Sequence, residues 1–252
     1  MRKRHIPALG CTEATSSPRD GMHGSLRWDG HPGRHPHWRQ TWAGGQTWAV
    51  ARAASRRGPR RAGQDGCVTL AFVRHGQTDW NREGRLQGSS DIPLNETGRE
   101  QAREAVRMLE AWTWDAVVSS PLARARDTAR ILADGLGLPL GPAYDELAER
   151  DYGPLEGTSS AAAITRWPDR SYPGAEPLDD VVARCLRGLE RIDADYPASN
   201  VVVVCHGTIM KYTLIRLTGY PVDVVLNGTV SAIERDGTGW RVLTINGEPV
   251  TA

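Results

Sequence analysis

The chain has 252 residues, with 31 Lys and Arg against 30 Asp and Glu and a formal net charge of +1. This length allows one large domain or two small ones with a sizeable buried core. No apolar run approaches the roughly 18 residues of a membrane span, no apolar core of a secretory signal is apparent, and the four cysteines form no C-x-x-C pair. We therefore expect a soluble, cytoplasmic protein without a disulfide framework or a membrane partner.

The charge is distributed unevenly. Residues 1–66 carry twelve basic and four acidic residues, a net charge of +8, whereas the remaining 19 basic and 26 acidic residues give −7. The first 66 residues also lack any sustained hydrophobic period, so they cannot bury enough apolar surface to offset the entropy lost on ordering. We predict a basic, disordered N-terminal extension over 1–66 and a folded domain over 67–252.

The first predicted elements form two strand–helix units. Residues 68–73 (VTLAFV) are a short apolar run before a polar loop, which is typical of a buried parallel strand. A helix capped by Asn95 or Thr97 follows, and residues 115–120 (DAVVSS) form a second strand with a helix after it. The inward positions of the two helices are Ala102, Ala105, Val106 and Leu109, then Leu122, Ala125, Ala129, Leu132 and Leu136.

The second half begins with the clearest helix, EPLDDVVARCLRGLERIDADY. A β-branched strand, NVVVVC (200–205), comes next, then a helix led by Gly207, then two strands near TVSAIE and WRVLTI around a turn at 235–237. The apolar stripe of the long helix is Leu178, Val181, Val182, Cys185, Leu186, Leu189 and Ile192. Strands that alternate with helices predict an α/β fold, a three-layer α/β/α sandwich with a mostly parallel central sheet.

Two histidines occur in the same setting. Of the seven histidines, five lie in residues 1–66, and the other two, His75 and His206, stand in FVRHGQ and VVCHGT, each after an apolar strand and before a glycine. Ligands of α/β sheets bind beyond the carboxyl ends of strands, so both imidazoles are expected in one crevice. A following glycine lets backbone or ligand approach closely.

Cations accompany these histidines. Arg74 precedes His75, and Arg124 follows the second predicted strand, again at a carboxyl end, whereas Arg126 is expected to point elsewhere. Guanidinium groups match phosphate oxygens and stay charged at any working pH. Two arginines and two histidines in one crevice therefore predict an anion site and argue against a metal cofactor.

This residue set suits phosphoryl transfer. A neutral imidazole can attack phosphorus and form a covalent phosphoramidate, while Arg74, Arg124 and a protonated His206 stabilise charge on the phosphoryl oxygens. A carboxylic acid must protonate the leaving group. The segment DELAERDYGPLEG offers five candidates, among which the residues alone do not choose: Asp145, Glu146, Glu149, Asp151 and Glu156.

The motifs RHGQTDWNREGRLQG, PLNETGREQA, SSPLARARDTA, LAERDYGPLEG and VVVVCHGT resemble, in order and spacing, the histidine phosphatase superfamily of phosphoglycerate mutase-like enzymes, from Val68 to near the C-terminus. The resemblance implies that His75 is phosphorylated, that Arg74, Arg124 and His206 hold the phosphate, and that Glu149 donates the proton. Glu156 would be a neighbouring structural acid. The expected substrate contacts are Gln77, Asn81, Gln87, Gly88, Gly207 and Thr208.

Residues 157–177, where a mutase of this family carries longer capping insertions, are short here. An open pocket admits water, so we expect a phosphatase for a small phosphorylated metabolite. Phosphoglycerate mutase-type transfer and a non-enzymatic phospholigand-binding module are the alternatives, and a homodimer stays open. Trp167, Arg170 and Tyr172 are expected to shape substrate choice.

Two other classes of function compete for the extension. Its arginines and tryptophans could contact single-stranded nucleic acid, but the net −7 of the remaining chain would repel a polyanion, so no specific nucleic-acid partner is expected. His31, His35 and His37 lie close together in HPGRHPH and could hold at most a weak adventitious metal ion.

Overall fold

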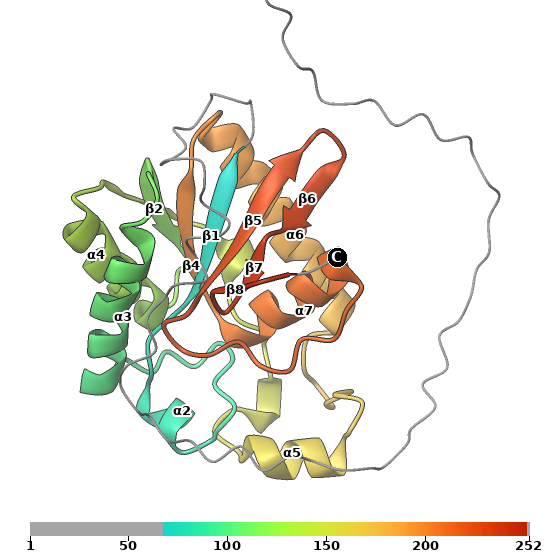
Figure 1. Cartoon of the computed structure of the whole chain (residues 1–252). Helices are drawn as coiled ribbons and strands as arrows, with labels where there is room; N and C mark the ends of the chain where they lie inside the picture. The colour runs from blue at the N-terminus through green and yellow to red at the C-terminus, as the bar shows by residue number, and fades with distance from the viewer. Residues whose placement is uncertain (1–67, 251–252) are drawn as a thin grey trace, which may run out of the picture. The chain divides into compact units, whose positions relative to one another are not determined.

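The fold is described from a computed structural model, for residues 68–250 (Figure 1). The predicted disordered extension and its histidine cluster lie outside the described residues, and the domain boundary stays a prediction. Six strands form one sheet in the order β3-β2-β4-β1-β5-β6. The first four strands of the chain are parallel, and β5 and β6 are antiparallel additions at one edge. The strands are β1 (Thr69–Arg74), β2 (Ala116–Ser119), β3 (Leu140–Ala143), β4 (Val201–Cys205), β5 (Val230–Asp236) and β6 (Gly239–Val242).

Helices cover both faces of this sheet. The helices are α2 (Asp79–Arg82), α3 (Glu96–Leu109), α4 (Ala123–Leu136), α5 (Ser160–Arg166), α6 (Leu178–Asp195) and α7 (Gly207–Thr218), with short 3₁₀ turns η1 (Asp145–Leu147) and η2 (Gly153–Leu155). In Figure 1, α3 and α4 lie on one side of the sheet and α6 and α7 on the other. The mostly parallel three-layer α/β/α architecture is confirmed.

Side-chain alternation along β1 explains the two cores. Leu70 and Phe72 belong to the cluster that α6 and α7 cover, whereas Ala71 and Val73 belong to the cluster under α3 and α4. Successive residues of a strand point to opposite faces, so a strand buried on both sides needs an unbroken apolar run. The all-apolar β4, buried at every position, meets the same requirement.

Local signals set the helix ends. The Asn95 side chain accepts a hydrogen bond from Gly98 N at 2.9 Å, so Asn95, rather than Thr97, caps α3. Gly137 ends α4 in the left-handed conformation, with φ 66°.

The structure adds elements that the sequence pattern missed. The edge strand β3 contains Gly141 and Pro142 and is mostly exposed, so it lacks an apolar signal. Helix α5 has only seven residues and a single buried position. The predicted last strand is divided into β6 and β7 (Thr244–Ile245), and β7 pairs with β8 (Glu248–Pro249).

The expected apolar stripe of α6 is only partly buried. Val181, Cys185, Leu189 and Ile192 are buried, but Leu178, Val182 and Leu186 are half-buried. The three half-buried residues line a shallow groove with Tyr212 and Ile215 of α7. Within residues 68–250, no helix is long and apolar enough to cross a membrane.

The loop after β1 packs directly on the first turn of α3, backbone against backbone. A Cβ atom on Gly76 would lie 2.1 Å from the carbonyl oxygen of Gly98, and one on Gly98 would lie 2.1 Å from the carbonyl oxygen of Gln77. Neither position has room for a side chain. This contact fixes the segment that carries His75.

We expect Gly98→Ala to lower the free energy of unfolding by about 1–3 kcal/mol, because the added methyl group must displace rigid backbone. Without that contact, alanine in a helix would stabilise instead. Urea unfolding measures the change. Gly237→Ala is the matched control, since nothing lies within 4 Å of its added Cβ. Equal effects of the two substitutions would contradict the argument.

Candidate active site

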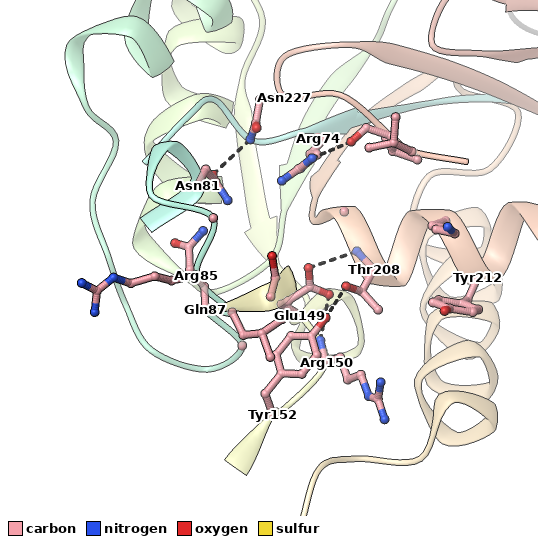
Figure 2. Close-up of a pocket in the computed structure, with 18 of the residues that line it drawn as sticks. Arg74, Asn81, Arg85, Gln87, Glu149, Arg150, Tyr152, Thr208, Tyr212 and Asn227 are labelled. Carbon is pink, nitrogen blue, oxygen red and sulfur yellow. Dashed lines mark hydrogen bonds between the residues drawn. The ribbon is translucent and has the colours of Figure 1, made fainter. Parts of the chain in front are cut away.

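The carboxyl ends of β1, β2 and β4 meet at one edge of the sheet, and a cavity of about 410 Å³ opens there. His75 follows β1, His206 follows β4, and Arg124 lies in the first turn of α4 after β2. Figure 2 shows Arg74, Glu149 and Thr208 around the cavity, with Asn81 and Gln87 on the opposite wall. The topology thus brings together residues that are 132 positions apart in the chain, from Arg74 to His206.

His75 is held in one orientation. Its ring is 2 % exposed, and Nδ1 lies 2.7 Å from the carbonyl oxygen of Gly76. A carbonyl oxygen only accepts, so Nδ1 carries the hydrogen and Nε2 keeps its lone pair. The side-chain amide of Asn227 donates to the His75 carbonyl oxygen at 2.9 Å and fixes the backbone.

His206 faces His75, with ring centroids 5.1 Å apart. It is fully buried, and its Nε2 lies 2.7 Å from the hydroxyl oxygen of Ser120. Its Nδ1 has no hydrogen-bond partner among the described residues. The ring is therefore anchored through one nitrogen and leaves the other available.

Both imidazoles are neutral when the site is empty. Burial lowers the pKa of His75 well below its ordinary value, and the charges of Arg124 and Arg74 lower it further. The pKa of His206 is lowered by burial first, then by Arg124 and by His75. The expectation of a protonated His206 concerns the site with phosphate bound and stays a prediction; in the empty site, desolvation and neighbouring cations disfavour a further positive charge.

Backbone carbonyls orient the two arginines. The Arg124 guanidinium is fully buried and donates from Nη1 to Ser90 O at 2.8 Å and from Nη2 to Gly88 O at 2.7 Å. Arg74 donates from Nη1 to Val225 O at 2.5 Å. Burial lowers the pKa of each guanidinium, and the negative charge of Glu149 opposes the shift in both.

Buried side-chain atoms without partners concentrate here. Among the described residues, four such nitrogen or oxygen atoms make no hydrogen bond, and three are Arg74 Nε, Arg124 Nε and His206 Nδ1. An unsatisfied buried polar atom costs about 1–3 kcal/mol, so a cluster of three points to a missing acceptor. A bound oxyanion would supply it.

The two glutamates considered for the proton donor, Glu149 and Glu156, have different surroundings in the structure. Glu149 lines the cavity, and its carboxylate accepts hydrogen bonds from Thr208 N at 3.1 Å and Ile209 N at 3.2 Å, in the first turn of α7. Glu156 is not among the lining residues and accepts instead from the backbone and hydroxyl groups of Ser89 and Ser90. Its role there is to hold the loop whose carbonyls orient Arg124.

Five of the six expected substrate contacts line the cavity: Asn81, Gln87, Gly88, Gly207 and Thr208. Gln77 does not line the cavity, and its expected substrate contact stays a prediction. Its amide oxygen accepts from Asn95 Nδ2 at 3.1 Å, so the side chain braces the start of α3. Trp167 also lies off the wall, in a small apolar cluster with Tyr172.

The sequence pattern missed several residues that line the cavity or contact its histidines. Asn227 bridges His75 and Asn81, yet it lies 152 positions after His75 with no motif around it. The Tyr152 hydroxyl lies 2.6 Å from the Thr208 hydroxyl, as Figure 2 shows. Ser120 could have been found from SSPLARA, because it ends the second strand as His75 ends the first.

Residues 70–248 match the family described as the histidine phosphatase superfamily (branch 1), which is well over half of the chain. The chain therefore belongs to this superfamily, and the resemblance seen in its motifs is confirmed.

Among its relatives, the chain is similar to PhoE, an uncharacterized phosphatase of Bacillus subtilis (strain 168), with 38% identity over 183 residues that cover 71% of this chain and 94% of PhoE. A 2,3-bisphosphoglycerate-dependent phosphoglycerate mutase of Bradyrhizobium sp. (strain BTAi1) is 40% identical over 165 residues, 59% of this chain and 80% of the mutase. The mycobacterial glucosyl-3-phosphoglycerate phosphatase Rv2419c, solved with VO3, has a TM-score of 0.63 and 29% identity, covering 71% of this chain and 98% of that one.

The lowered histidine pKa values predict how stability depends on pH. In the unfolded chain His75 and His206 take up protons below about pH 6.5, whereas the folded site resists protonation. The free energy of unfolding therefore decreases as pH falls from about 6.5 toward 5. The decrease is up to about 1.4 kcal/mol per pH unit for each histidine. Urea unfolding in phosphate-free buffers measures this slope. The variant carrying both His75→Asn and His206→Gln should lose most of it, and an unchanged slope would refute the assignment.

Proposed function

We propose that this protein is a phosphomonoester hydrolase that acts on a small phosphorylated metabolite through a phosphohistidine on His75. Membership of the superfamily supports phosphate chemistry. The observation that carries the proposal is the group of three unpartnered buried donors, on Arg74, Arg124 and His206, beside the free Nε2 of His75. A site with these donors and one aligned imidazole suits attack on phosphorus.

In the first step, Nε2 of His75 attacks phosphorus and the ester oxygen leaves. The Gly76 carbonyl accepts from Nδ1–H and stabilises the positive charge that develops on the ring. Arg74 and Arg124 neutralise the phosphoryl oxygens from fixed positions, so little reorganisation is needed as charge shifts. The incoming dianion also favours protonation of His206, which is neutral in the empty site.

Glu149 is the proposed proton donor to the leaving oxygen. It lines the same cavity and sits at the start of α7, next to Gly207 and Thr208. In the second step water attacks the phosphohistidine, and Glu149 takes up a proton from that water. Phosphate is released and His75 returns to its first state.

Hydrolysis is preferred to mutase-type transfer, although mutases are among the relatives. The segment between η2 and α6 holds only the seven-residue helix α5 and turns, so it supplies only a short cover for the cavity. Water can then reach the phosphohistidine. Incubation with 3-phosphoglycerate separates the two functions, since a phosphatase releases inorganic phosphate and a mutase yields 2-phosphoglycerate.

We expect His75→Ala to lower the turnover of p-nitrophenyl phosphate by at least about 10³-fold, because the covalent route is lost. Wild-type enzyme stopped rapidly in alkali during turnover of a ³²P-labelled ester should carry acid-labile label, and the variant should not. Glu149→Gln should slow turnover of esters with poor leaving groups far more than that of p-nitrophenyl phosphate. Full activity of His75→Ala would refute the proposal.

Turnover should be unchanged in EDTA, because the proposed chemistry uses guanidinium groups and an imidazole. Among residues 68–250, no group of three or more His, Cys, Asp or Glu side chains is arranged to hold a metal ion. Loss of activity in chelator with recovery on adding a divalent metal would contradict the proposed mechanism.

A further inference from the structure

The cavity carries more positive charge than one phosphate group requires. Six cationic side chains of the described chain line it, against two carboxylates, Glu149 and Asp223. The cations are Arg74, Arg85, Arg124, Arg150, Arg170 and Lys211. Because Arg85 is already paired with Glu83, the other five cations exceed the two carboxylates by three charges, and a phosphate monoester dianion would leave one of these without a counter-charge.

Three of these cations donate hydrogen bonds only to neutral groups, although the charge of Asp223 also acts on Lys211 beyond ion-pair distance. Among residues 68–250, none of Arg150, Arg170 and Lys211 forms an ion pair, whereas Arg85 pairs with Glu83 at 2.8 Å. Lys211 Nζ donates to the backbone carbonyl of Asp223 at 2.7 Å. Arg170 reaches only the hydroxyl of Tyr172, at 3.4 Å.

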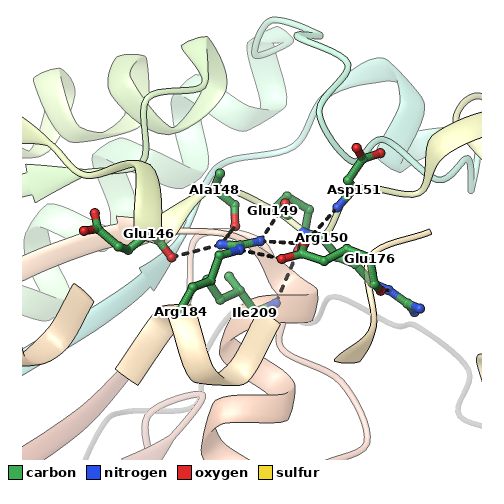
Figure 3. Close-up of polar contacts among 8 residues, drawn as sticks. All are labelled: Glu146, Ala148, Glu149, Arg150, Asp151, Glu176, Arg184 and Ile209. Atoms are coloured by element: carbon green, nitrogen blue, oxygen red, sulfur yellow. Dashed lines mark hydrogen bonds and ion pairs between the residues drawn. The ribbon is translucent and has the colours of Figure 1, made fainter. Parts of the chain in front are cut away.

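The carboxylate of Glu176 pairs with Arg184 and not with Arg150. The Glu176 carboxylate is bound by Arg184 at 2.7 and 2.9 Å, as Figure 3 shows. Arg150 donates to the backbone carbonyl oxygens of Glu176 and Arg170, and its guanidinium lies over the rings of Tyr152 and Tyr172, at 5.4 and 5.1 Å from their centroids. Among the described residues, its buried charge has no ion pair and is offset only by these groups and by the more distant charge of Glu176, so an anionic ligand nearby would stabilise it further.

Arg170 is placed by a strained loop. Its backbone has φ 64°, a left-handed conformation that is rare outside glycine, and its carbonyl is held by Arg150. Strain of this kind persists where a function requires a particular side-chain position. Lys211, on α7, lies near enough for the charge of Arg170 to lower its pKa, after the larger effect of burial. Two like charges thus approach each other on the cavity wall.

We propose that the substrate of this enzyme carries a second anionic group, a carboxylate or a further phosphate, and that Arg170 and Lys211 bind it. This inference rests on the proposed function for the phosphate end of the substrate. Arg150 stiffens the loop that presents Arg170 and adds its charge to the same region. The second anion would occupy the outer part of the cavity, away from His75.

The test compares esters that differ only in the second group. 3-Phosphoglycerate is compared with glycerol 3-phosphate, and fructose 1,6-bisphosphate with fructose 6-phosphate, so that the two arms separate a carboxylate from a phosphate. The wild-type enzyme should favour the second-anion ester of at least one pair by about tenfold or more in kcat/KM, the effect of a charge-assisted contact. Equal kcat/KM within both pairs would overturn the proposal.

The variants Arg170→Gln and Lys211→Gln should each reduce that preference by about tenfold, and Lys211→Arg should restore most of it. Arg166→Gln on α5 and Arg216→Gln on α7 are matched controls, because these exposed arginines do not line the cavity. The controls should keep the wild-type preference. If the Arg170 and Lys211 variants lose kcat/KM by the same factor for both esters of a pair, these residues have a merely structural role. That result would overturn their assignment to the second-anion site.

A binding measurement separates this inference from the proposed function. In the His75→Ala variant, 3-phosphoglycerate should bind at least about tenfold more tightly than glycerol 3-phosphate by calorimetry, if the second anion is a carboxylate. Absence of hydrolysis by the wild-type enzyme with this binding preference intact would refute the hydrolase and leave the second-anion site. Hydrolysis without any preference in binding or turnover, for either pair, would refute the second-anion site and leave the hydrolase.

Discussion

A buried and a half-buried guanidinium group and two buried imidazoles share the edge of this sheet with one carboxylate. Desolvation and mutual repulsion make that arrangement unfavourable by itself, and they hold both histidines neutral. The surrounding structure keeps these groups together by giving each one a neutral partner: the carbonyls of Gly88, Ser90 and Val225 for the arginines, and a carbonyl and a hydroxyl for the rings. What remains unsatisfied is a set of donors matched to an oxyanion.

Two sets of polar contacts, made by Glu156 and by Arg184, support this arrangement. Glu156 fixes the loop at Ser89 and Ser90, and that loop in turn supplies carbonyl groups to Arg124. Arg184 binds the backbone carbonyls of Glu146, Ala148 and Glu149 and so positions the segment of the proposed acid (Figure 3). Each set of contacts joins segments that are far apart in sequence. The positions of Arg124 and Glu149 therefore depend on side chains that do not line the cavity.

The sequence alone predicts those parts of the site that local chemistry specifies. A His-Gly pair after an apolar strand places both imidazoles, and the Asn95 cap and the apolar stripes place most helices. Long-range contacts are not predictable from the local sequence. Nothing around Asn227 or Lys211 indicates that they line the cavity. Gln77 lies close to His75 in sequence, yet its side chain binds Asn95 at the start of α3. The short, polar elements β3 and α5 carry no periodic signal. The charge of His206 depends on burial and neighbours that only the fold supplies.

The position of β1 inside the sheet has a consequence for biosynthesis. This strand emerges first among the described elements, but its two neighbours are β4 and β5, with Leu70 paired to Val201 on one side and to Ile233 on the other. A growing polypeptide on the ribosome must therefore keep an apolar segment unpaired until more than 130 further residues have been translated. Such non-local pairing slows folding and leaves an apolar strand edge exposed meanwhile, which raises the risk of aggregation before the chain is complete.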